Sequence, residues 1–499
     1  MTKYVKIHSK DDVAVAVCAI SEGETIADGE RVIKVSEPIE RGHKIALRDM
    51  EEGEQVIKYG YPIGSLTCDV TAGSLIHVHN LRTGLSDNLE YQYHPNKCLN
   101  VSTAALDERK FFMGYERRDG RVGIRNELWI IPTVGCVNEN ARRIAELCKN
   151  LKSDNINNVT SFSHSYGCSQ MGDDQENTRI ALANLIRHPN AGAVLVLGLG
   201  CENSNISVLK NYLGEYDANR IRFLECQEVD DEIEEGTKIV RELAAIMAGD
   251  RRTKQPVSKL VVGLKCGGSD GLSGITANPV VGAFSDRLIA NGGSTILTEV
   301  PEMFGAETIL MDRACDEEVF NKTVDLINDF KDYYRRHGQT IYENPSPGNK
   351  AGGISTLEDK ALGCTQKSGS AMVCDVLKYG ERIKKAGLNL LSAPGNDLVA
   401  STALAISDAQ LVLFTTGRGT PFACPVPTVK ISTNNALYEK KRNWIDFNCG
   451  TLISDENVTI ESLSSQLYDY VLAVAGNEPV KSELMGYCDL AIFKQGVTL

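Results

Sequence analysis

Five cysteines directly follow apolar, strand-like runs of the sequence, and their thiols are candidates for metal chemistry. They are Cys136, Cys168, Cys201, Cys226 and Cys266. Ligands of open parallel sheets bind beyond the carboxyl ends of the strands, so we expect several of these thiols to face one crevice. Thiolates select iron and zinc, but none of the five has the paired spacing of a zinc ribbon or a ferredoxin. Two interpretations stay open: each cysteine is a small buried residue that finishes a strand, or Cys136, Cys168, Cys201 and Cys266 hold iron or an iron–sulfur cluster.

Two histidines in the phrase His77-Val78-His79-Asn80 offer a second candidate metal site. Strand side chains alternate between two faces, so a strand here would place both imidazoles on one face. Imidazole is a common ligand of iron-group metals, and Arg82 could bind an anion beside such a metal. An exposed strand end can also carry histidines without any ligand. We predict a metal site at His77 and His79, with the thiol crevice as the alternative.

Two loops are candidate anion sites. The glycine-rich loop at residues 266–274 follows a strand and precedes a helix-like run, a layout that presents backbone N–H groups to an anion. We interpret Ser269 and Asp270 in it as substrate contacts, although glycines also serve plain turns. Arg418 follows another predicted strand and offers a bidentate fork to a carboxylate. Arg125 is a further candidate, although such charges are more often solvated.

One more histidine lies where it could move protons. His164 is near the end of its predicted strand, and imidazole exchanges a proton near neutral pH. A structural histidine held by hydrogen bonds is an equal alternative. The sequence has no nucleophile elbow around a serine and no Walker motif, which argues against the hydrolases and phosphotransferases that need them.

The elements that carry these residues change character along the chain. Short alternating segments separated by turn signals fill the first hundred residues and predict a small all-β module. Strand-like and helix-like runs then alternate, which is typical of doubly wound α/β domains. A chain of 499 residues exceeds one usual core. We expect a β module at 1–97, a linker at 98–115, a middle α/β domain at 116–250 and a C-terminal α/β domain at 251–499.

The composition argues against several classes of partner. The net charge is −13 and the pI is about 5.3, so no basic field is available for nucleic acid or an anionic membrane. The sequence has neither a run of about 18 uncharged apolar residues nor a signal-like start. We therefore expect a cytoplasmic protein whose 15 cysteines are thiols.

These phrases together resemble the altronate/galactarate dehydratase family along the whole chain. The resemblance is carried by Arg41-Gly42-His43-Lys44, Lys58-Tyr59-Gly60, His77-Val78-His79-Asn80, Thr133-Val134-Gly135-Cys136, Tyr166-Gly167-Cys168-Ser169-Gln170, Cys266-Gly267-Gly268-Ser269-Asp270, Glu299-Val300-Pro301-Glu302 and Ala393-Pro394-Gly395-Asn396-Asp397. It implies a SAF-type β-clip module, a middle α/β domain and a C-terminal Rossmann-like domain. It also implies a requirement for Fe²⁺, mononuclear or in a cluster, and loss of water from an aldonic or aldaric acid. The expected reaction converts D-altronate to 2-dehydro-3-deoxy-D-gluconate in hexuronate breakdown.

The chemistry that this resemblance implies assigns roles to the candidate residues. The hydrogen beside a carboxylate is a very weak acid, so a metal and fixed donors must stabilise the enediolate while a base removes the proton. His77 and His79 would bind the metal, and Arg418 and the loop at 266–270 would anchor the carboxylate. The proton would be moved by His164 or Lys265.

Two alternatives to this function stay open. The chain could act on another acid, such as galactarate or sulfolactate, because such specificity rests on a few pocket contacts. It could also be a sugar-acid binding protein without chemistry. We expect a homodimer, because that is the commonest assembly.

Overall fold

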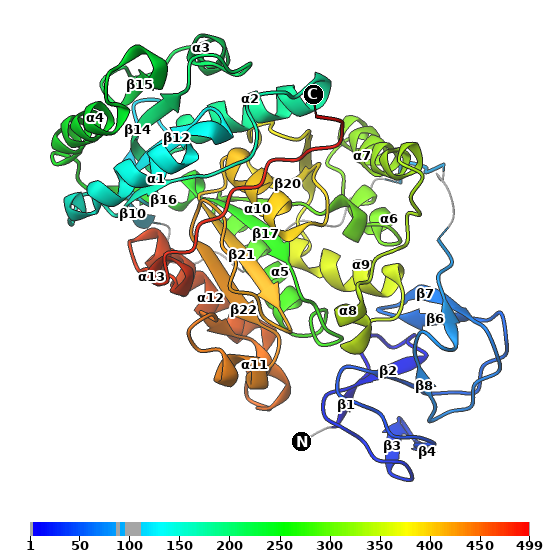
Figure 1. Cartoon of the computed structure of the whole chain (residues 1–499). Helices are drawn as coiled ribbons and strands as arrows, with labels where there is room; N and C mark the ends of the chain where they lie inside the picture. Colours follow the sequence, from blue (N-terminus) through cyan, green and yellow to red (C-terminus); the bar gives the residue numbers. More distant parts are fainter. Residues whose placement is uncertain (1–2, 86–89, 95–110, 499) are drawn as a thin grey trace.

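The computed structural model describes residues 3–85, 90–94 and 111–498, and the chain folds there into three successive regions with separate sheets (Figure 1). The first region, here called the N-terminal module, contains the antiparallel sheets β1-β2-β5-β8, β3-β4 and β6-β7-β9. Its strands are β1 (Tyr4–Val5), β2 (Val13–Ala16), β3 (Thr25–Asp28), β4 (Arg31–Lys34), β5 (Lys44–Ala46), β6 (Gln55–Lys58), β7 (Tyr61–Leu66), β8 (Leu75–Ile76) and β9 (Leu81–Arg82). The predicted all-β module is confirmed.

One strand of this module is shorter than the sequence predicts. β8 is followed at once by a turn at residues 77–80. The Asn80 side chain favours the turn, since its Oδ1 accepts from the His77 N–H at 2.9 Å and its Nδ2 donates to the Leu75 carbonyl at 2.8 Å. The turn leaves His77 half-buried and His79 exposed. The prediction that a strand places both imidazoles on one face is therefore wrong.

The second region, here called the middle region, is built on a four-stranded parallel sheet of order β13-β12-β14-β15. Its elements are β12 (Glu127–Pro132), α1 (Asn138–Leu147), β13 (Val159–Ser161), α2 (Gly172–Ile186), β14 (Ala191–Gly198), α3 (Ile206–Leu213), β15 (Ile221–Glu225) and α4 (Glu232–Met247). Successive side chains of β12 point to opposite faces. Leu128 packs with α1 and α4 on one face, whereas Trp129 packs with α2 and α3 on the other.

The third region, here called the C-terminal region, is built on a seven-stranded parallel sheet of order β19-β20-β18-β17-β21-β22-β23. Its strands are β17 (Val261–Cys266), β18 (Ser294–Leu297), β19 (Val373–Leu377), β20 (Gly387–Leu391), β21 (Leu411–Thr416), β22 (Thr428–Ser432) and β23 (Phe447–Asn448). Its helices include α5 (Ala277–Ala290), α6 (Glu307–Met311), α7 (Glu317–Arg336), α8 (Pro347–Ala351), α9 (Leu357–Thr365), α10 (Asp397–Ile406), α11 (Asn435–Lys440), α12 (Ile460–Ala475) and α13 (Lys481–Leu484). The fold is the expected multidomain α/β arrangement, and this sheet is compatible with the Rossmann-like expectation.

The strand order of the large sheet marks where a ligand should bind. The chain runs from β17 outward through β18 to β19 and β20, then returns to place β21 on the other side of β17. The order therefore switches direction between β17 and β21. In open parallel sheets the crevice at the carboxyl end of such a switch is the usual ligand site.

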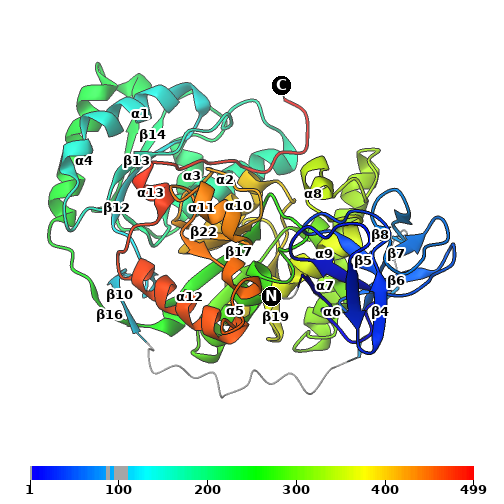
Figure 2. The ribbon, with the colours of Figure 1, turned by 90° about the horizontal axis from the view of Figure 1, so that it is seen from below.

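The connections between regions are partly strands. Residues 98–110 of the expected linker lie outside the described residues, and residues 111–115 belong to β10 (Phe111–Glu116). β10 pairs with β16 (Thr253–Pro256) and with β11 (Val122–Gly123), so it joins the chain before and after the middle region. Figure 2 shows the N-terminal module against the end of the C-terminal region that holds α6, α7 and α9.

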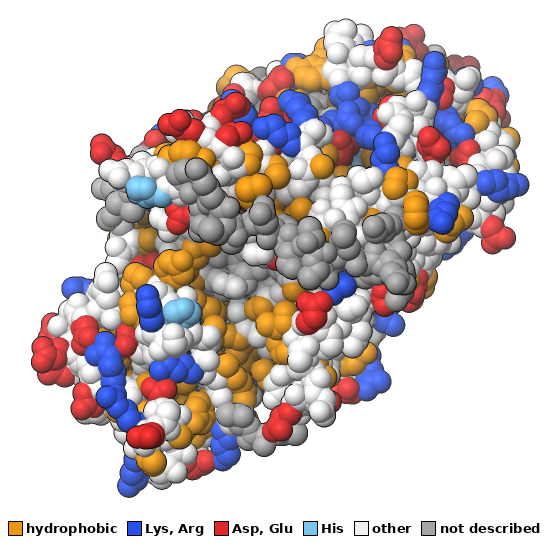
Figure 3. Space-filling view, turned by 180° about the vertical axis from the view of Figure 1, so that it is seen from behind, with side chains coloured by type: hydrophobic (Ala, Val, Ile, Leu, Met, Phe, Trp, Pro, Cys, Tyr) orange, Lys and Arg blue, Asp and Glu red, His pale blue; other side chains and the backbone are white. Residues whose placement is uncertain are grey.

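Charges of both signs share the molecular surface. On the face in Figure 3, Lys and Arg side chains are interspersed with Asp and Glu side chains. Among the described residues, no helix is both long and apolar enough to cross a membrane. The absence of a nucleic-acid partner stays a prediction.

Candidate active site

Several polar side chains meet at the carboxyl edge of the large sheet. β17 ends in Lys265 and Cys266, and the turn after β18 carries Glu299 and Glu302. Cys364 comes from α9, which packs against this edge. All five residues are buried. The backbone of Glu299 has φ 71°, a left-handed conformation that is strained for a residue with a side chain. Such strain is often found at functional sites.

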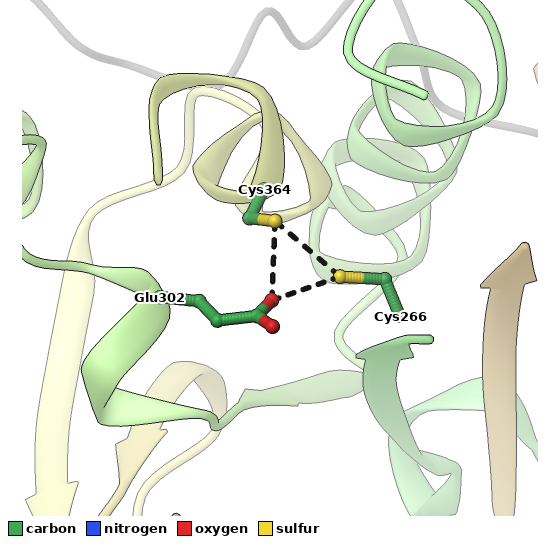
Figure 4. Close-up of side chains that lie close together, drawn as sticks. All are labelled: Cys266, Glu302 and Cys364. Carbon is green, nitrogen blue, oxygen red and sulfur yellow. Dashed lines mark hydrogen bonds between the residues drawn. The ribbon is translucent and has the colours of Figure 1, made fainter. Parts of the chain in front are cut away.

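Three of these side chains form a compact group of metal-ligand types (Figure 4). The Cys266 and Cys364 sulfurs each lie 3.1 Å from Oε2 of Glu302 and 3.4 Å from one another. Their ligand atoms all lie within 4.8 Å of one another. Thiolate and carboxylate donors together suit a divalent metal such as iron or zinc. The group therefore fits a metal ion, without identifying which one.

Lysines surround this group. Lys367 Nζ lies 2.8 Å from the Cys266 sulfur, and Lys360 Nζ lies 2.8 Å from Oε1 of Glu302. Lys265 forms a very short ion pair with Glu299 and a second one, at 2.9 Å, with Asp397. Burial alone would lower the pKa of Lys265, but the two carboxylates outweigh it and raise the pKa, so this lysine stays protonated.

The charges of the cluster balance in two states. When both thiols are neutral, three ammonium groups face three carboxylates. The ammonium groups belong to Lys265, Lys360 and Lys367, and the carboxylates belong to Glu299, Glu302 and Asp397. A dication bound by two thiolates adds two positive and two negative charges, so the site stays neutral when a metal replaces two thiol protons. Because an unbalanced buried charge is costly, this exchange makes metal binding electrostatically feasible.

The N-terminal module docks beside this cluster through a buried ion triad. Lys44 and Lys58 each place Nζ 2.8 Å from a different oxygen of Asp359, which lies in the first turn of α9. Both lysines hold the pKa of Asp359 well below its usual range, against the effect of burial. The backbones also approach closely, because a Cβ on Gly271 would lie 1.9 Å from the Gly42 carbonyl oxygen.

The predicted histidine site lies on this docked face of the module. The His77 ring meets the His43 ring edge-on, with 5.0 Å between centroids. His77 Nδ1 is buried and has no hydrogen-bond partner among the described residues. Burial, together with nearby Lys44 and His43, lowers the pKa of His77 to about 4, so the ring is neutral at pH 7. His79 and Arg82 are exposed.

The predicted anion loops meet at the switch point between β17 and β21. The Arg418 backbone N–H donates to the Gly268 carbonyl at 3.0 Å, and the exposed Arg418 side chain has Nη1 3.4 Å from the Gly348 carbonyl oxygen. Ser269 is buried. Asp270 accepts hydrogen bonds from the hydroxyls of Ser273 and Thr433, at 3.0 Å each, which hold the loop in place.

His164 and Arg125 have their polar groups engaged elsewhere. His164 Nε2 lies 2.8 Å from the Pro132 carbonyl, and His164 Nδ1 accepts from the Tyr166 N–H at 3.2 Å. Burial lowers the pKa of His164. All five N–H groups of Arg125 donate, to Glu483 and to three backbone carbonyls. Both residues connect structural elements and have no donor or acceptor left for a substrate.

The strand-end cysteines divide between two sheets. Cys136, Cys168, Cys201 and Cys226 follow the four strands of the middle sheet, whereas Cys266 ends β17 of the large sheet. The expectation that Cys266 shares one crevice with Cys136, Cys168 and Cys201 is therefore wrong, because their strands belong to different sheets. All described cysteines are free thiols.

Several residues of the buried cluster were not predicted as functional residues from the sequence. Glu299, Glu302 and Asp397 stood in phrases that carried the family resemblance, but no role was assigned to them. Cys364 and Lys360 lie on α9, where no strand-end pattern marks them. The sequence could have indicated the three acidic residues by their positions after β18 and β20. Loops that follow parallel strands lie together at the carboxyl edge of the sheet, where ligands bind.

Another cavity lies away from this cluster. It measures about 970 Å³ and is lined by the amino ends of β14 and β15 and by several arginines. Its arginines are largely paired, for example Arg220 with Asp250 at 2.6 Å and Arg382 with Asp408 at 2.9 Å. Because ligands of parallel sheets bind at the carboxyl ends, we place the candidate site at the cluster around Cys266.

Three family models match successive parts of the chain. Residues 2–84 match the altronate/galactarate dehydratase SAF domain. Residues 114–248 match the second domain of D-galactarate dehydratase/altronate hydrolase, and residues 257–498 match the D-galactarate/altronate dehydratase C-terminal model.

Full-length relatives agree with these matches. The chain is 54% identical to altronate dehydratase of Bacillus subtilis (strain 168) and 52% identical to altronate dehydratase of Escherichia coli (strain K12), each over 100% of both chains. It is 32% identical to galactarate dehydratase (L-threo-forming) of Escherichia coli (strain K12), over 98% of this chain and 96% of the relative. The chain therefore belongs to the altronate/galactarate dehydratase family.

Proposed function

We propose that this chain is a hydro-lyase that converts D-altronate to 2-dehydro-3-deoxy-D-gluconate and water in hexuronate breakdown. The observation that carries the proposal is its 52–54% identity to two altronate dehydratases over their full length. The match spans the regions that hold the buried cluster and the docked N-terminal module. A similarity confined to one region would leave the site incomplete.

The cluster supports the electrostatic part of this reaction. Removing the proton beside a carboxylate puts a second negative charge on that group, which must be stabilised by fixed positive groups. Lys265, Lys360 and Lys367 are held in place by carboxylates and are buried. Such cations need no reorganisation when charge develops, and the low dielectric strengthens their effect.

We assign proton transfer to Lys265 and not to His164. Lys265 is kept protonated by Glu299 and Asp397, so it can give a proton to the C3 hydroxyl, which leaves as water. A carboxylate beside it can take the proton from C2 and return it to the neutral Lys265 amine. His164 has both ring nitrogens bound to the backbone. The exposed Arg418 and the buried Ser269 are proposed to hold the substrate's carboxylate and hydroxyl groups.

We propose Fe²⁺ as the metal and Cys266, Glu302 and Cys364 as its holders. When bound, it would supply Lewis-acid stabilisation of the substrate oxygens. The earlier assignment to His77 and His79 stays a prediction. It is supported by the neutral His77 ring with its unpartnered Nδ1, but His79 is exposed and separated from it by the turn.

Entry of the substrate needs a local movement. A cavity lined by Lys58 and Tyr59 of the module and by the loop at 269–274 holds about 10 Å³, which is about the space of one water. A six-carbon acid does not fit there. We propose that the module and the loop separate to admit it.

The remaining expectations also stay proposals. We propose a cytoplasmic location, a sugar acid as the small-molecule partner and a homodimeric assembly.

Anaerobic turnover with added ferrous iron tests the proposal. D-altronate, galactarate and sulfolactate are compared for product, with a chelator-treated sample as control. We expect chelator-sensitive formation of the 2-keto-3-deoxy acid with D-altronate above the other two. Faster turnover of galactarate would change the substrate and keep the mechanism, whereas binding of all three acids without product would favour a sugar-acid binding protein.

A further inference from the structure

The cavity at the amino ends of β14 and β15 has no role in the proposed reaction. It measures about 970 Å³, which is within the usual size of small-molecule sites, about 300–1,000 Å³. Three parts of the chain form its wall: the turn between β10 and β11, the middle region, and the loop between β19 and β20. None of the residues that line it belongs to the buried cluster around Cys266. The cavity is therefore a separate candidate for ligand binding.

Arginine sets the charge of this wall. Seven arginines line the cavity, and none of its described lining residues is a lysine, in a chain whose net charge is −13. Two of the seven are exposed, and five are half-buried: Arg117, Arg121, Arg187, Arg220 and Arg382. Salt screens partly buried charges much less than exposed ones. These five guanidinium groups therefore dominate the local field.

Acidic side chains balance this charge only in part. Arg220 pairs with Asp250 at 2.6 Å, and Arg121 and Arg382 share the two oxygens of the buried Asp408 at 2.8 and 2.9 Å. Arg382 uses only its Nε for this pair, so its two terminal nitrogens have no acceptor among the described residues. Five acidic side chains line the cavity. Even with Asp408 added to them, the arginines remain in excess.

Arg117 pairs with no carboxylate among the described residues. It donates to the Pro189 carbonyl at 2.7 Å, to Oδ1 of Asn126 at 2.9 Å and to the Arg125 carbonyl at 3.0 Å. A guanidinium group has five N–H donors, so two of them remain without a protein acceptor there. Burial lowers the pKa of Arg117 to about 10, because nearby Asp250 offsets only part of the cost of burying its charge.

Arg187 also donates to backbone groups and to no carboxylate among the described residues. Its partners are the carbonyls of Ala183 at 3.2 Å, Tyr212 at 2.6 Å and Leu213 at 3.4 Å, in the last turns of α2 and α3. The partial negative charge of these helix ends offsets part of its positive charge. Burial and two neighbouring arginines nevertheless lower the pKa of Arg187. An anion in the cavity would therefore be attracted by Arg187 as well as by Arg117.

We propose that this cavity binds a small organic anion through the free N–H donors of Arg117, Arg187 and Arg382. Guanidinium groups match the oxygens of phosphate and carboxylate groups bidentately. The cavity is much larger than an inorganic oxyanion, so the ligand is a phosphorylated or carboxylated small molecule. Arg187 belongs to the middle region and Arg382 to the C-terminal region, so the anion links the two. The site stands or falls independently of the proposed function.

Calorimetric titration of the full chain tests the proposal with two probes, glycerol 3-phosphate and succinate, at equal ionic strength. We expect saturable binding, and the probe that binds more tightly identifies the anionic group. Arg187→Gln and Arg382→Gln should each weaken binding at least about tenfold, the effect of losing a hydrogen bond to a charged group. Arg222→Gln removes the same charge from an exposed position on β15 outside the cavity and should leave binding unchanged. Absence of binding by both probes, or unweakened binding by the Arg187 and Arg382 variants, would overturn the proposal.

Arginine modification by phenylglyoxal gives a second test on the unaltered chain, which does not depend on the folding of any variant. With the tighter probe at about ten times its Kd, about one site in eleven is free, so modification of Arg187 and Arg382 should slow about tenfold. Arg222 and Arg418 are both exposed and should react at unchanged rates, as mapped by mass spectrometry. Protection of Arg418 in place of Arg187 and Arg382 would put the anion at the candidate active site and contradict the proposal.

Discussion

Replacing Asp359 by Asn tests how the N-terminal module docks. Each Asp359 oxygen lies 2.8 Å from one ammonium nitrogen, of Lys44 or of Lys58, and the three side chains are at most 3% exposed. Asparagine keeps the shape but removes the charge, so two buried ammonium groups lose their counter-ion. Removing one partner of a buried ion pair costs about 3–5 kcal/mol. The free energy of docking should fall by that amount.

Hydrogen exchange measured by mass spectrometry on the peptide that spans β6 and β7 reports this change. A loss of about 3–5 kcal/mol speeds exchange through undocking by about a hundredfold to several thousandfold, since about 1.4 kcal/mol is tenfold. Asp28→Asn is the matched control, because its partner Lys6 and Asp28 itself are about a quarter exposed and such pairs contribute at most about 1 kcal/mol. Exchange within threefold of the unaltered chain for Asp359→Asn would refute the reasoning.

Three further predictions concern pH, packing and metal. Burial raises the pKa of Glu127 to about 7, so the stability that its protonated form contributes is complete below about pH 4.5 and is lost as the pH rises through 7. Denaturation at pH 5 and at pH 8 measures this dependence, and Glu127→Gln should remove up to about 3 kcal/mol of it. Gly271→Ala should cost about 1–3 kcal/mol by overpacking, seen as a lower melting temperature, while Gly249→Ala, whose Cβ has room, should not. Cys364→Ser should weaken iron binding at least tenfold in anaerobic dialysis, and the buried Cys424→Ser should leave it unchanged.

Strand ends were predictable from the sequence, but the sheet to which each strand belongs was not. Apolar runs that stop at a glycine or a cysteine correctly located the ends of β12, β14 and β17. Assigning Cys136 and Cys266 to different sheets requires the pairing of strands, which depends on long-range contacts. The local pattern of apolar and polar residues does not indicate those long-range contacts.

The grouping of Cys266, Glu302 and Cys364 could not be predicted from the sequence either. Cys266 was found because it ends a strand, whereas its partner Cys364 lies 98 residues further on, on a helix. Nothing in the helix sequence marks that side chain as facing a strand end. In the histidine phrase, the failure was local instead: the side chain of Asn80 competes for backbone hydrogen bonds and replaces the expected strand by a turn.

The most direct test of the proposed site is D-altronate turnover by Lys265→Gln and His164→Gln, measured side by side without oxygen and with ferrous iron. Circular dichroism of each variant controls for folding. The account predicts that Lys265→Gln lowers kcat by about a hundredfold to ten-thousandfold, the usual contribution of a positioned proton donor, while His164→Gln stays within tenfold of the unaltered chain. Full activity of Lys265→Gln, with loss of activity in His164→Gln, would contradict the placement of the reaction at the edge of the large sheet.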